Sequence, residues 1–192
     1  MGDLGGLVSD RDELKALILA RSIRLGDFVL ASGAKSDYYI DARATTMSAE
    51  GQRLVGLVAG RAIRDGGLEP SHVGGLTMGA DPVAYAIAHR SALEGRPIDA
   101  FSVRKRAKEH GTGQRVEGGL PKRARCLIVE DTMTTGRSSL EAVEAVREHG
   151  AEVVGVLALV NRSREAAALY QRERIPLLWV FTGEELLRAA RA

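Results

Sequence analysis

Two patterns of hydrophobic residues, one typical of helices and one typical of buried strands, alternate along most of this chain. From about residue 48 onward, segments with an apolar residue every three or four positions alternate with short runs that are almost wholly apolar. The run at 153–160 is nearly continuous, as expected of a parallel strand buried on both faces. This strand–helix order predicts the α/β fold class, with a mainly parallel twisted sheet, right-handed crossovers and helices on both faces.

The same patterns give approximate bounds for the elements. Strands are expected near residues 72–76, 98–103, 125–130, 153–160 and 177–181. Helices are expected near residues 49–65, from 82 onward, at 138–148, at 163–173 and close to the C-terminus. The polar stretch that ends near residue 122 is predicted to be a loop, and Trp179 to lie in the core.

The first 47 residues follow a different pattern. A helix is predicted from Asp10 to Leu25, because Asp10 and Glu13 have the spacing of a capping box and Gly26 can end a helix. Two short strands, near 28–30 and 38–41, are expected to form a hairpin. No linker divides the chain, so we expect one domain over residues 1–192, with a small N-terminal element at 1–47 and an α/β core at 48–192.

Composition and charge exclude several classes of protein. Hydrophobic residues make up 45% and charged residues 27%, as in soluble globular proteins, and a net charge of +2 gives no indication of nucleic-acid binding. The apolar runs are shorter than the ~20 residues of a membrane span, and the N-terminus lacks the pattern of a secretory signal. The single cysteine, Cys126, has no partner for an intrachain disulfide, so we expect a cytoplasmic protein.

The most informative stretch runs from Leu127 to Ser139 and reads LIVEDTMTTGRSS. It joins an apolar strand, two acids, a turn rich in hydroxyls and glycine, and the start of a helix. Backbone N–H groups at such a turn and helix N-terminus suit a phosphate, and the carboxylates of Glu130 and Asp131 suit the vicinal hydroxyls of a ribose. A capped strand-to-helix loop is the alternative, but capping does not require this combination.

A second candidate is the basic loop between the predicted strands at 98–103 and 125–130. It contains two glycines, one histidine and five cations, namely Arg104, Lys105, Arg106, Lys108 and Arg115. Little apolar surface anchors such a loop, so we expect it to be mobile until a polyanion orders it. A solvated basic turn is the alternative; beside a phosphate-binding turn, the cations are better suited to neutralising a departing diphosphate.

Two further features are weak alone. The glycine-rich turn 74–82 lies between a strand and a helix, where a ligand can approach the backbone closely. Arg162 follows the buried strand, and its guanidinium suits a carboxylate. The histidines show no metal-ligand spacing to one another or to Cys126, so no protein metal site is expected.

Together these segments resemble the type I phosphoribosyltransferases, and among them the orotate phosphoribosyltransferases, over nearly the whole chain. The stretch around Glu130 and Asp131 resembles the superfamily's motif for phosphoribosyl pyrophosphate (PRPP). Three features point to orotate: the N-terminal hairpin with Ser-Gly-x-Lys-Ser-x-Tyr-Tyr at 32–39, the basic loop, and Arg162.

The resemblance implies transfer of a 5-phosphoribosyl group from PRPP to orotate, giving orotidine 5′-monophosphate and pyrophosphate in pyrimidine biosynthesis. The cofactor implied is Mg²⁺, held mainly through PRPP. The residues implied in ribose and phosphate binding are Glu130, Asp131, Thr132, Met133, Thr134, Thr135, Gly136, Arg137 and Ser138. Pyrophosphate contacts are implied for Arg104, Lys105, Lys108 and His110, and catalytic roles for Lys108, Asp131, Arg104 and His110.

For the base, the resemblance implies contacts from Thr134 and Arg162, with the hairpin as a hood above it. It also implies a homodimer in which the loop around Lys105 reaches the neighbouring subunit's site. Neither nucleic acid nor a membrane is an expected partner.

Three positions depart from the family pattern. Ala31 and Met78 stand where many relatives have lysine, and Asn161 where aspartate is frequent. Lys35 is a candidate substitute for the first lysine. The alternatives are a purine or xanthine phosphoribosyltransferase, a PRPP-sensing regulator that binds RNA or DNA, and a relative with a degenerate pocket.

Overall fold

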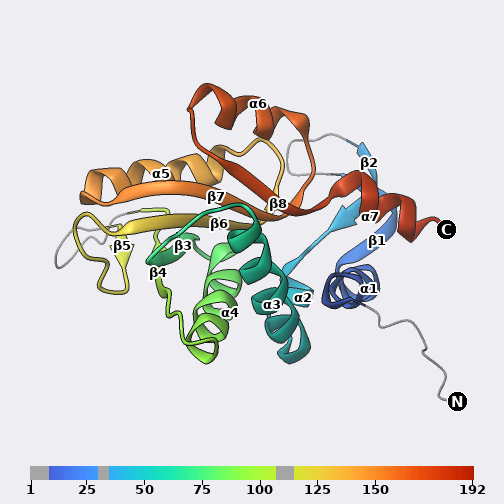
Figure 1. The fold of residues 1–192 in the computed structure, drawn as a ribbon. Helices are drawn as coiled ribbons and strands as arrows, with labels where there is room; N and C mark the ends of the chain where they lie inside the picture. The colour runs from blue at the N-terminus through green and yellow to red at the C-terminus, as the bar shows by residue number, and fades with distance from the viewer. Residues whose placement is uncertain (1–8, 30–34, 107–114) are drawn as a thin grey trace, which may run out of the picture.

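The computed structural model describes residues 9–29, 35–106 and 115–192 (Figure 1). Its helices are α1 (Asp10–Ser22), α2 (Arg43–Thr46), α3 (Ala49–Asp65), α4 (Ala80–Leu93), α5 (Arg137–His149), α6 (Arg164–Arg172) and α7 (Gly183–Ala190). Its strands are β1 (Ile23–Val29), β2 (Lys35–Ile40), β3 (His72–Leu76), β4 (Asp99–Val103), β5 (Val116–Glu117), β6 (Arg125–Met133), β7 (Glu152–Asn161) and β8 (Leu177–Thr182).

In the described part of the chain, six strands form the main sheet, in the order β5-β4-β3-β6-β7-β8. Neighbouring strands are parallel except at the β4–β5 edge, which is antiparallel. The predicted α/β fold class is therefore confirmed. Parallel order brings the carboxyl ends of β3, β4, β6 and β7 to the same edge of the sheet, where ligands of such folds bind.

Helices cover both faces of this sheet, with α5 and α6 on one side and α1, α3 and α4 on the other (Figure 1). Alternation along β6 follows from these layers, because successive side chains of a strand point to opposite faces. Cys126 and Ile128 lie in the core under α5, whereas Leu127 and Val129 lie in the core against α3 and α4. All four are fully buried.

The N-terminal strands form a separate two-stranded antiparallel sheet. The helix predicted to reach Leu25 ends at Ser22, because Ile23 already pairs with Ile40, and Leu25 pairs with Tyr38. The capping box predicted at Asp10 is also wrong: Ser9 is the N-cap, and its hydroxyl accepts the N–H of Asp12.

The hairpin strands, predicted near 28–30 and 38–41, lie at Ile23–Val29 and Lys35–Ile40, and the short helix α2 was not predicted. From residue 48 onward the predicted bounds are close to the observed ones, with two exceptions. Strand β6 continues to Met133, because it pairs with β7 as far as Asn161, so both acids lie on a strand. The predicted loop before residue 122 contains the short edge strand β5. Trp179, predicted to be core, is 44% exposed on the edge strand β8.

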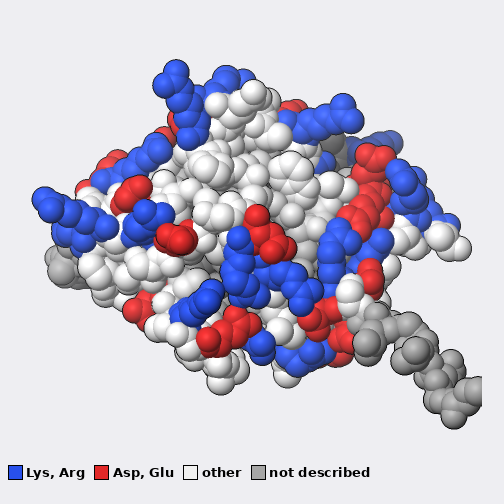
Figure 2. All heavy atoms as spheres, viewed as in Figure 1, with Lys and Arg blue, Asp and Glu red and all other residues white. Residues whose placement is uncertain are grey.

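On the face drawn in Figure 2, acidic and basic side chains are intermixed rather than gathered into one basic patch. None of the helices in the described part of the chain combines the length and apolar character needed to span a membrane.

Candidate functional site

A cavity of about 500 Å³ opens at the carboxyl ends of β3 and β6. Its walls come from the hairpin, the β3–α4 turn, the end of β4, and the β6–α5 segment. The lining residues are Tyr39, Ile40, Asp41, Ala42, Arg43, Leu76, Thr77, Met78, Gly79, Lys105, Glu130, Asp131, Thr132 and Ser138.

Glu130 is the buried carboxylate of this cavity, with 7% of its surface exposed. It continues the side of β6 that carries Ile128, and its carboxyl group therefore points toward the start of α5. There the hydroxyls of Ser138 and Ser139 both donate to Oε2, each at 2.8 Å. Burial, followed by the charge of Asp131, raises the pKa of Glu130 to about 7 despite these two donors.

Asp131 is half-buried, and its Oδ1 accepts the N–H of Thr132 at 2.7 Å. A Cβ atom built on Gly79 would lie 2.6 Å from the same Oδ1, so only glycine lets the β3–α4 turn approach the acid so closely. Burial raises the pKa of Asp131, while the Thr132 N–H and the charge of Arg43 act in the opposite direction. Burial thus raises the pKa of both acids, and in their ionised form the pair can accept hydrogen bonds from two hydroxyls.

The turn after β6 is shaped by Gly136, which precedes α5 with a φ of 78° in the left-handed region. The hydroxyl of Tyr170, from α6, donates to the Gly136 carbonyl at 2.9 Å, and a Cβ on Gly136 would meet the Tyr170 ring at 2.9 Å. Glycine is therefore required here for two reasons: other residues rarely adopt this φ, and a Cβ atom would clash with the Tyr170 ring. Thr134, Thr135, Arg137 and Ser138 are exposed around the N-terminus of α5, the arrangement that binds anions.

Two predicted residues of this segment lie differently. The Met133 side chain is buried in the core beneath α5, and its carbonyl accepts the N–H of Arg162 at 2.8 Å. Thr132 lines the cavity, and its hydroxyl is buried without a hydrogen-bond partner among the described residues.

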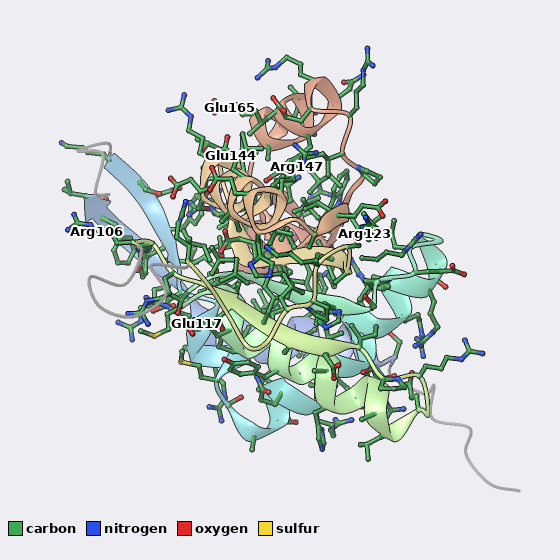
Figure 3. The ribbon with its side chains drawn as sticks, turned by 90° about the vertical axis from the view of Figure 1, so that its left-hand side faces the viewer. Arg106, Glu117, Arg123, Glu144, Arg147 and Glu165 are labelled. Atoms are coloured by element: carbon green, nitrogen blue, oxygen red, sulfur yellow. The ribbon has the colours of Figure 1, made fainter. Side chains whose placement is uncertain are left out.

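The basic loop leaves the sheet at the β4–β5 edge, which Figure 3 views. Lys105 lines the cavity, and Arg104 lies 3.5 Å from the carboxylate of Glu117 on β5. Lys108 and His110, the other two residues predicted to contact pyrophosphate, lie outside the described residues.

A hydrogen-bond network supports the β3–α4 turn from α4. Asp81 accepts from the Thr77 hydroxyl at 2.5 Å and from the Ser102 hydroxyl at 2.7 Å. It therefore ties this turn to the end of β4, from which the basic loop begins. The Thr77–Met78 peptide bond is cis.

The hairpin side of the cavity carries a residue that sequence reasoning missed. Arg43, at the start of α2, donates from Nε to Oδ1 of Asp41 at 2.8 Å and from Nη2 to Oδ2 at 3.0 Å. This pair raises the pKa of Arg43 and lowers that of Asp41. The only signal in the sequence is an Asp-x-Arg triplet directly after a strand.

Arg162 lies in a separate hollow beside the hairpin and α7, lined also by Tyr38, Gly183 and Leu187. Its guanidinium lies over the Tyr38 ring, 4.9 Å from the centroid. Its Nε is buried and donates to no acceptor within the described parts of the chain. Tyr38 faces this arginine whereas Tyr39 lines the cavity with the acids, as alternation along β2 requires.

A second cavity, of about 520 Å³, lies between α3 and α4 at the other end of the sheet. Two of its arginines, Arg64 and Arg90, both contact Glu94, at 2.8 and 2.7 Å. Because the acids and the anion-binding turn are elsewhere, we place the candidate active site at the cavity around Glu130 and Asp131.

Comparison with known proteins identifies the family of the chain. Residues 49–174 match the model of the phosphoribosyl transferase domain. The chain is similar to orotate phosphoribosyltransferases of Aquifex aeolicus (42% identical, covering 94% of this chain and all of the relative) and Streptomyces coelicolor (48%, 92% and 96%). Among solved structures, it is similar to Mycobacterium tuberculosis orotate phosphoribosyltransferase in complex with PRPP (TM-score 0.79, 40% identity, covering 93% and 99%).

Proposed function

This chain belongs to the orotate phosphoribosyltransferase family, and from that premise we propose that it transfers the 5-phosphoribosyl group of PRPP to orotate. One observation carries the proposal. Two adjacent acids, a left-handed glycine turn and an open helix N-terminus follow one another on β6 and α5, and the cation Lys105 lines the same cavity as the acids.

In the proposed arrangement, the segment from Thr134 to Ser138 holds the 5′-phosphate and the acids hold the ribose. Exposed hydroxyls and backbone N–H groups at the start of α5 suit a dianion. Glu130 and Asp131 accept hydrogen bonds from the 2′- and 3′-hydroxyls. Held at both ends, the sugar presents its anomeric carbon to the base, so that positioning supplies much of the rate acceleration.

Breaking the C1–O bond leaves positive charge on the ribose ring and negative charge on the departing pyrophosphate. No covalent nucleophile is needed, because the site only has to stabilise both charges and align the base nitrogen. Arg104, Lys105, Lys108 and His110 are proposed to neutralise pyrophosphate. A loop that closes over it would exclude water and thereby favour transfer to orotate over hydrolysis.

Mg²⁺ is the proposed cofactor. The residues present fit it, because the oxygen atoms of Asp131 and Glu130 border the cavity that would contain the ribose hydroxyls and diphosphate. When bound, the ion would neutralise part of the diphosphate charge. These carboxylates would orient the ribose hydroxyls beside it.

Orotate is proposed to bind between the end of β7 and the hairpin hood. Arg162 provides a guanidinium that Tyr38 covers on one face, an arrangement suited to the carboxylate of orotate. Thr134 is exposed at the neighbouring strand end, within the proposed base site. A purine has no carboxylate for this arginine, so the purine and xanthine alternatives are disfavoured.

We also propose a homodimer, with the loop around Lys105 reaching the partner's site. On α4, Tyr85 and Leu93 are 51% and 68% exposed, and Met78 of the adjoining turn is 58% exposed. Met78 and Tyr85 lie at or near the active-site turn and Leu93 at the far end of α4, so exposed apolar side chains occur along this helix and suit contact with a second copy. Sedimentation velocity tests this proposal, and a monomer at micromolar concentration would contradict it.

The single cysteine is buried and its pKa is raised to about 12 by burial, so it is a poor thiolate for disulfide exchange. The proposed cytoplasmic location rests instead on the sequence, whose single cysteine can form no intrachain disulfide. One domain with an N-terminal hood at 1–47 and a core at 48–192 is the proposed organisation.

A spectrophotometric assay tests the proposed function. Orotate absorbance should fall when the protein is mixed with PRPP and Mg²⁺, and uracil, adenine and hypoxanthine should not react. Reaction with a purine instead would favour the purine enzyme. A salt-dependent gel shift of RNA or DNA without turnover would favour the PRPP-sensing regulator. Absence of both turnover and nucleic-acid binding would indicate a relative with a degenerate pocket.

A further inference from the structure

We propose that Arg43 binds the diphosphate of PRPP, through guanidinium N–H groups that its ion pair with Asp41 leaves free. This inference rests on the proposed function and adds a residue from the N-terminal element to the phosphate-binding set.

The position of Arg43 is the first argument. It lines the same cavity as Met78, Gly79 and Lys105. The turn residues 133–137 do not line this cavity, whereas both acids do. A sugar whose 5′-phosphate lies at that turn and whose hydroxyls lie at the acids therefore directs its C1 substituent into this cavity, which Arg43 lines.

The geometry of the guanidinium is the second argument. Asp41 accepts from Nε and from one N–H of Nη2, at 2.8 and 3.0 Å. An arginine has five such N–H groups, so about three remain for a ligand. The side chain is 45% exposed, so the cavity reaches it. Because Asp41 already holds the guanidinium in place, binding a phosphate costs little additional side-chain entropy.

Charge is the third argument. Within the described ranges of the chain, three carboxylates line the cavity, those of Asp41, Glu130 and Asp131. Among the described residues, Arg43 and Lys105 are the cations of its lining. A pyrophosphate group carries several negative charges, so a lining with more acids than bases would repel it. A fixed arginine offsets this repulsion and presents the donor geometry that suits phosphate oxygens.

A purely structural role is the competing explanation, in which the Arg43–Asp41 pair only secures the start of α2. The two roles predict different results. A structural defect lowers thermal stability and weakens the binding of every substrate. Loss of a residue that binds the diphosphate weakens the binding of PRPP and pyrophosphate and leaves the orotate KM unchanged.

The experiment compares R43A and R43K with the parent and with the double variant R43A/M78K. The readouts are the KM for PRPP, the KM for orotate, inhibition by Mg²⁺-pyrophosphate and the melting temperature. In R43A, the KM for PRPP and the inhibition constant of pyrophosphate should rise together by about 10- to 100-fold, as for a lost charge-assisted hydrogen bond. Both constants of R43K should lie between those of R43A and the parent, since lysine retains the charge but lacks the planar guanidinium.

Met78 is 58% exposed in the same lining, so a lysine there can place an ammonium near the lost guanidinium. M78K is therefore also made in the parent. We expect it to raise the pyrophosphate affinity of R43A by a larger factor than that of the parent, whereas a purely structural role of Arg43 predicts equal factors. Unchanged PRPP and pyrophosphate constants in R43A would overturn the proposal. If R43A does not fold, an R43K variant with the parent's constants would overturn it equally. A parent protein without turnover of PRPP and orotate would instead refute the proposed function.

Discussion

Ser139→Ala tests how the site controls the charge of its buried acid. Ser139 is fully buried, and its hydroxyl donates to Oε2 of Glu130 at 2.8 Å. That donor favours the ionised carboxylate, which is the form that accepts hydrogen bonds from ribose hydroxyls. Removing the hydroxyl leaves the Ser138 hydroxyl, which donates to the same oxygen at 2.8 Å.

The magnitude follows from the pKa of Glu130, which burial raises to about 7. A hydrogen bond to a charged group contributes roughly 1.5–3 kcal/mol, and 1.36 kcal/mol corresponds to one pKa unit, so the variant's pKa should rise by about 1–2 units. At pH 7 the ionised fraction then falls from about one half to about 1–10%, and kcat/KM for PRPP should fall roughly 5- to 50-fold. Near pH 9.5 most of the loss should be recovered.

The assay is kcat/KM for PRPP as a function of pH, measured for the parent, Ser139→Ala and Ser91→Ala. Ser91 is a matched control: it is buried and donates its hydroxyl to the Ala88 carbonyl within α4, away from the acids. The control should keep the parent's profile, with activity rising through about pH 7. A Ser139→Ala profile with the parent's midpoint would refute this account of Glu130.

Four further predictions concern other parts of the site. First, Glu130 has a raised pKa in the folded protein, so its contribution to stability is present below pH ~4.5 and is lost as the pH rises through about 7. Chemical denaturation of the ligand-free protein should show up to ~3 kcal/mol of this loss, and an equal slope in Glu130→Gln would contradict it. Second, Gly136→Ala should lower the free energy of unfolding by about 1–3 kcal/mol and weaken PRPP binding, because φ is 78° and Tyr170 occupies the space of a Cβ atom. An unchanged melting temperature and an unchanged KM for PRPP would argue against this. Third, Lys108→Ala should lower kcat about 10²- to 10³-fold with a smaller effect on PRPP binding, measured by steady-state kinetics; a parent-like kcat would show that this cation does not assist pyrophosphate departure. Fourth, Arg162→Ala should chiefly raise the KM for orotate, and a variant that discriminates orotate from uracil as well as the parent does would exclude the carboxylate contact.

The core of the fold was predictable from the sequence because its signals are local. A buried strand such as β7 reads as a continuous apolar run, and α3 and α5 show helical periodicity. The N-terminal element was less predictable, since cross-strand pairing of Ile23 with Ile40 ended a helix whose apolar pattern continued to Leu25. Trp179 was misplaced for a similar reason, because no local pattern indicates which strand lies at an edge.

The residues of the candidate site likewise divide into those that local sequence predicts and those that only the folded chain brings together. Glu130, Asp131 and the turn at Gly136 are contiguous in sequence, so their chemistry can be predicted together. Arg43 and Tyr170 reach the site from α2 and α6, through contacts that only the folded chain forms. The approach of Gly79 to Asp131 likewise depends on the pairing of β3 with β6, which no sequence pattern specifies.

The most direct measurement is a crystal structure of the protein with PRPP and Mg²⁺. The account predicts the 5′-phosphate at the N-terminus of α5, within hydrogen-bond distance of residues 134–138, and both ribose hydroxyls on Glu130 and Asp131. A fully occupied PRPP bound with its sugar elsewhere, leaving the acids without ribose contacts, would contradict it.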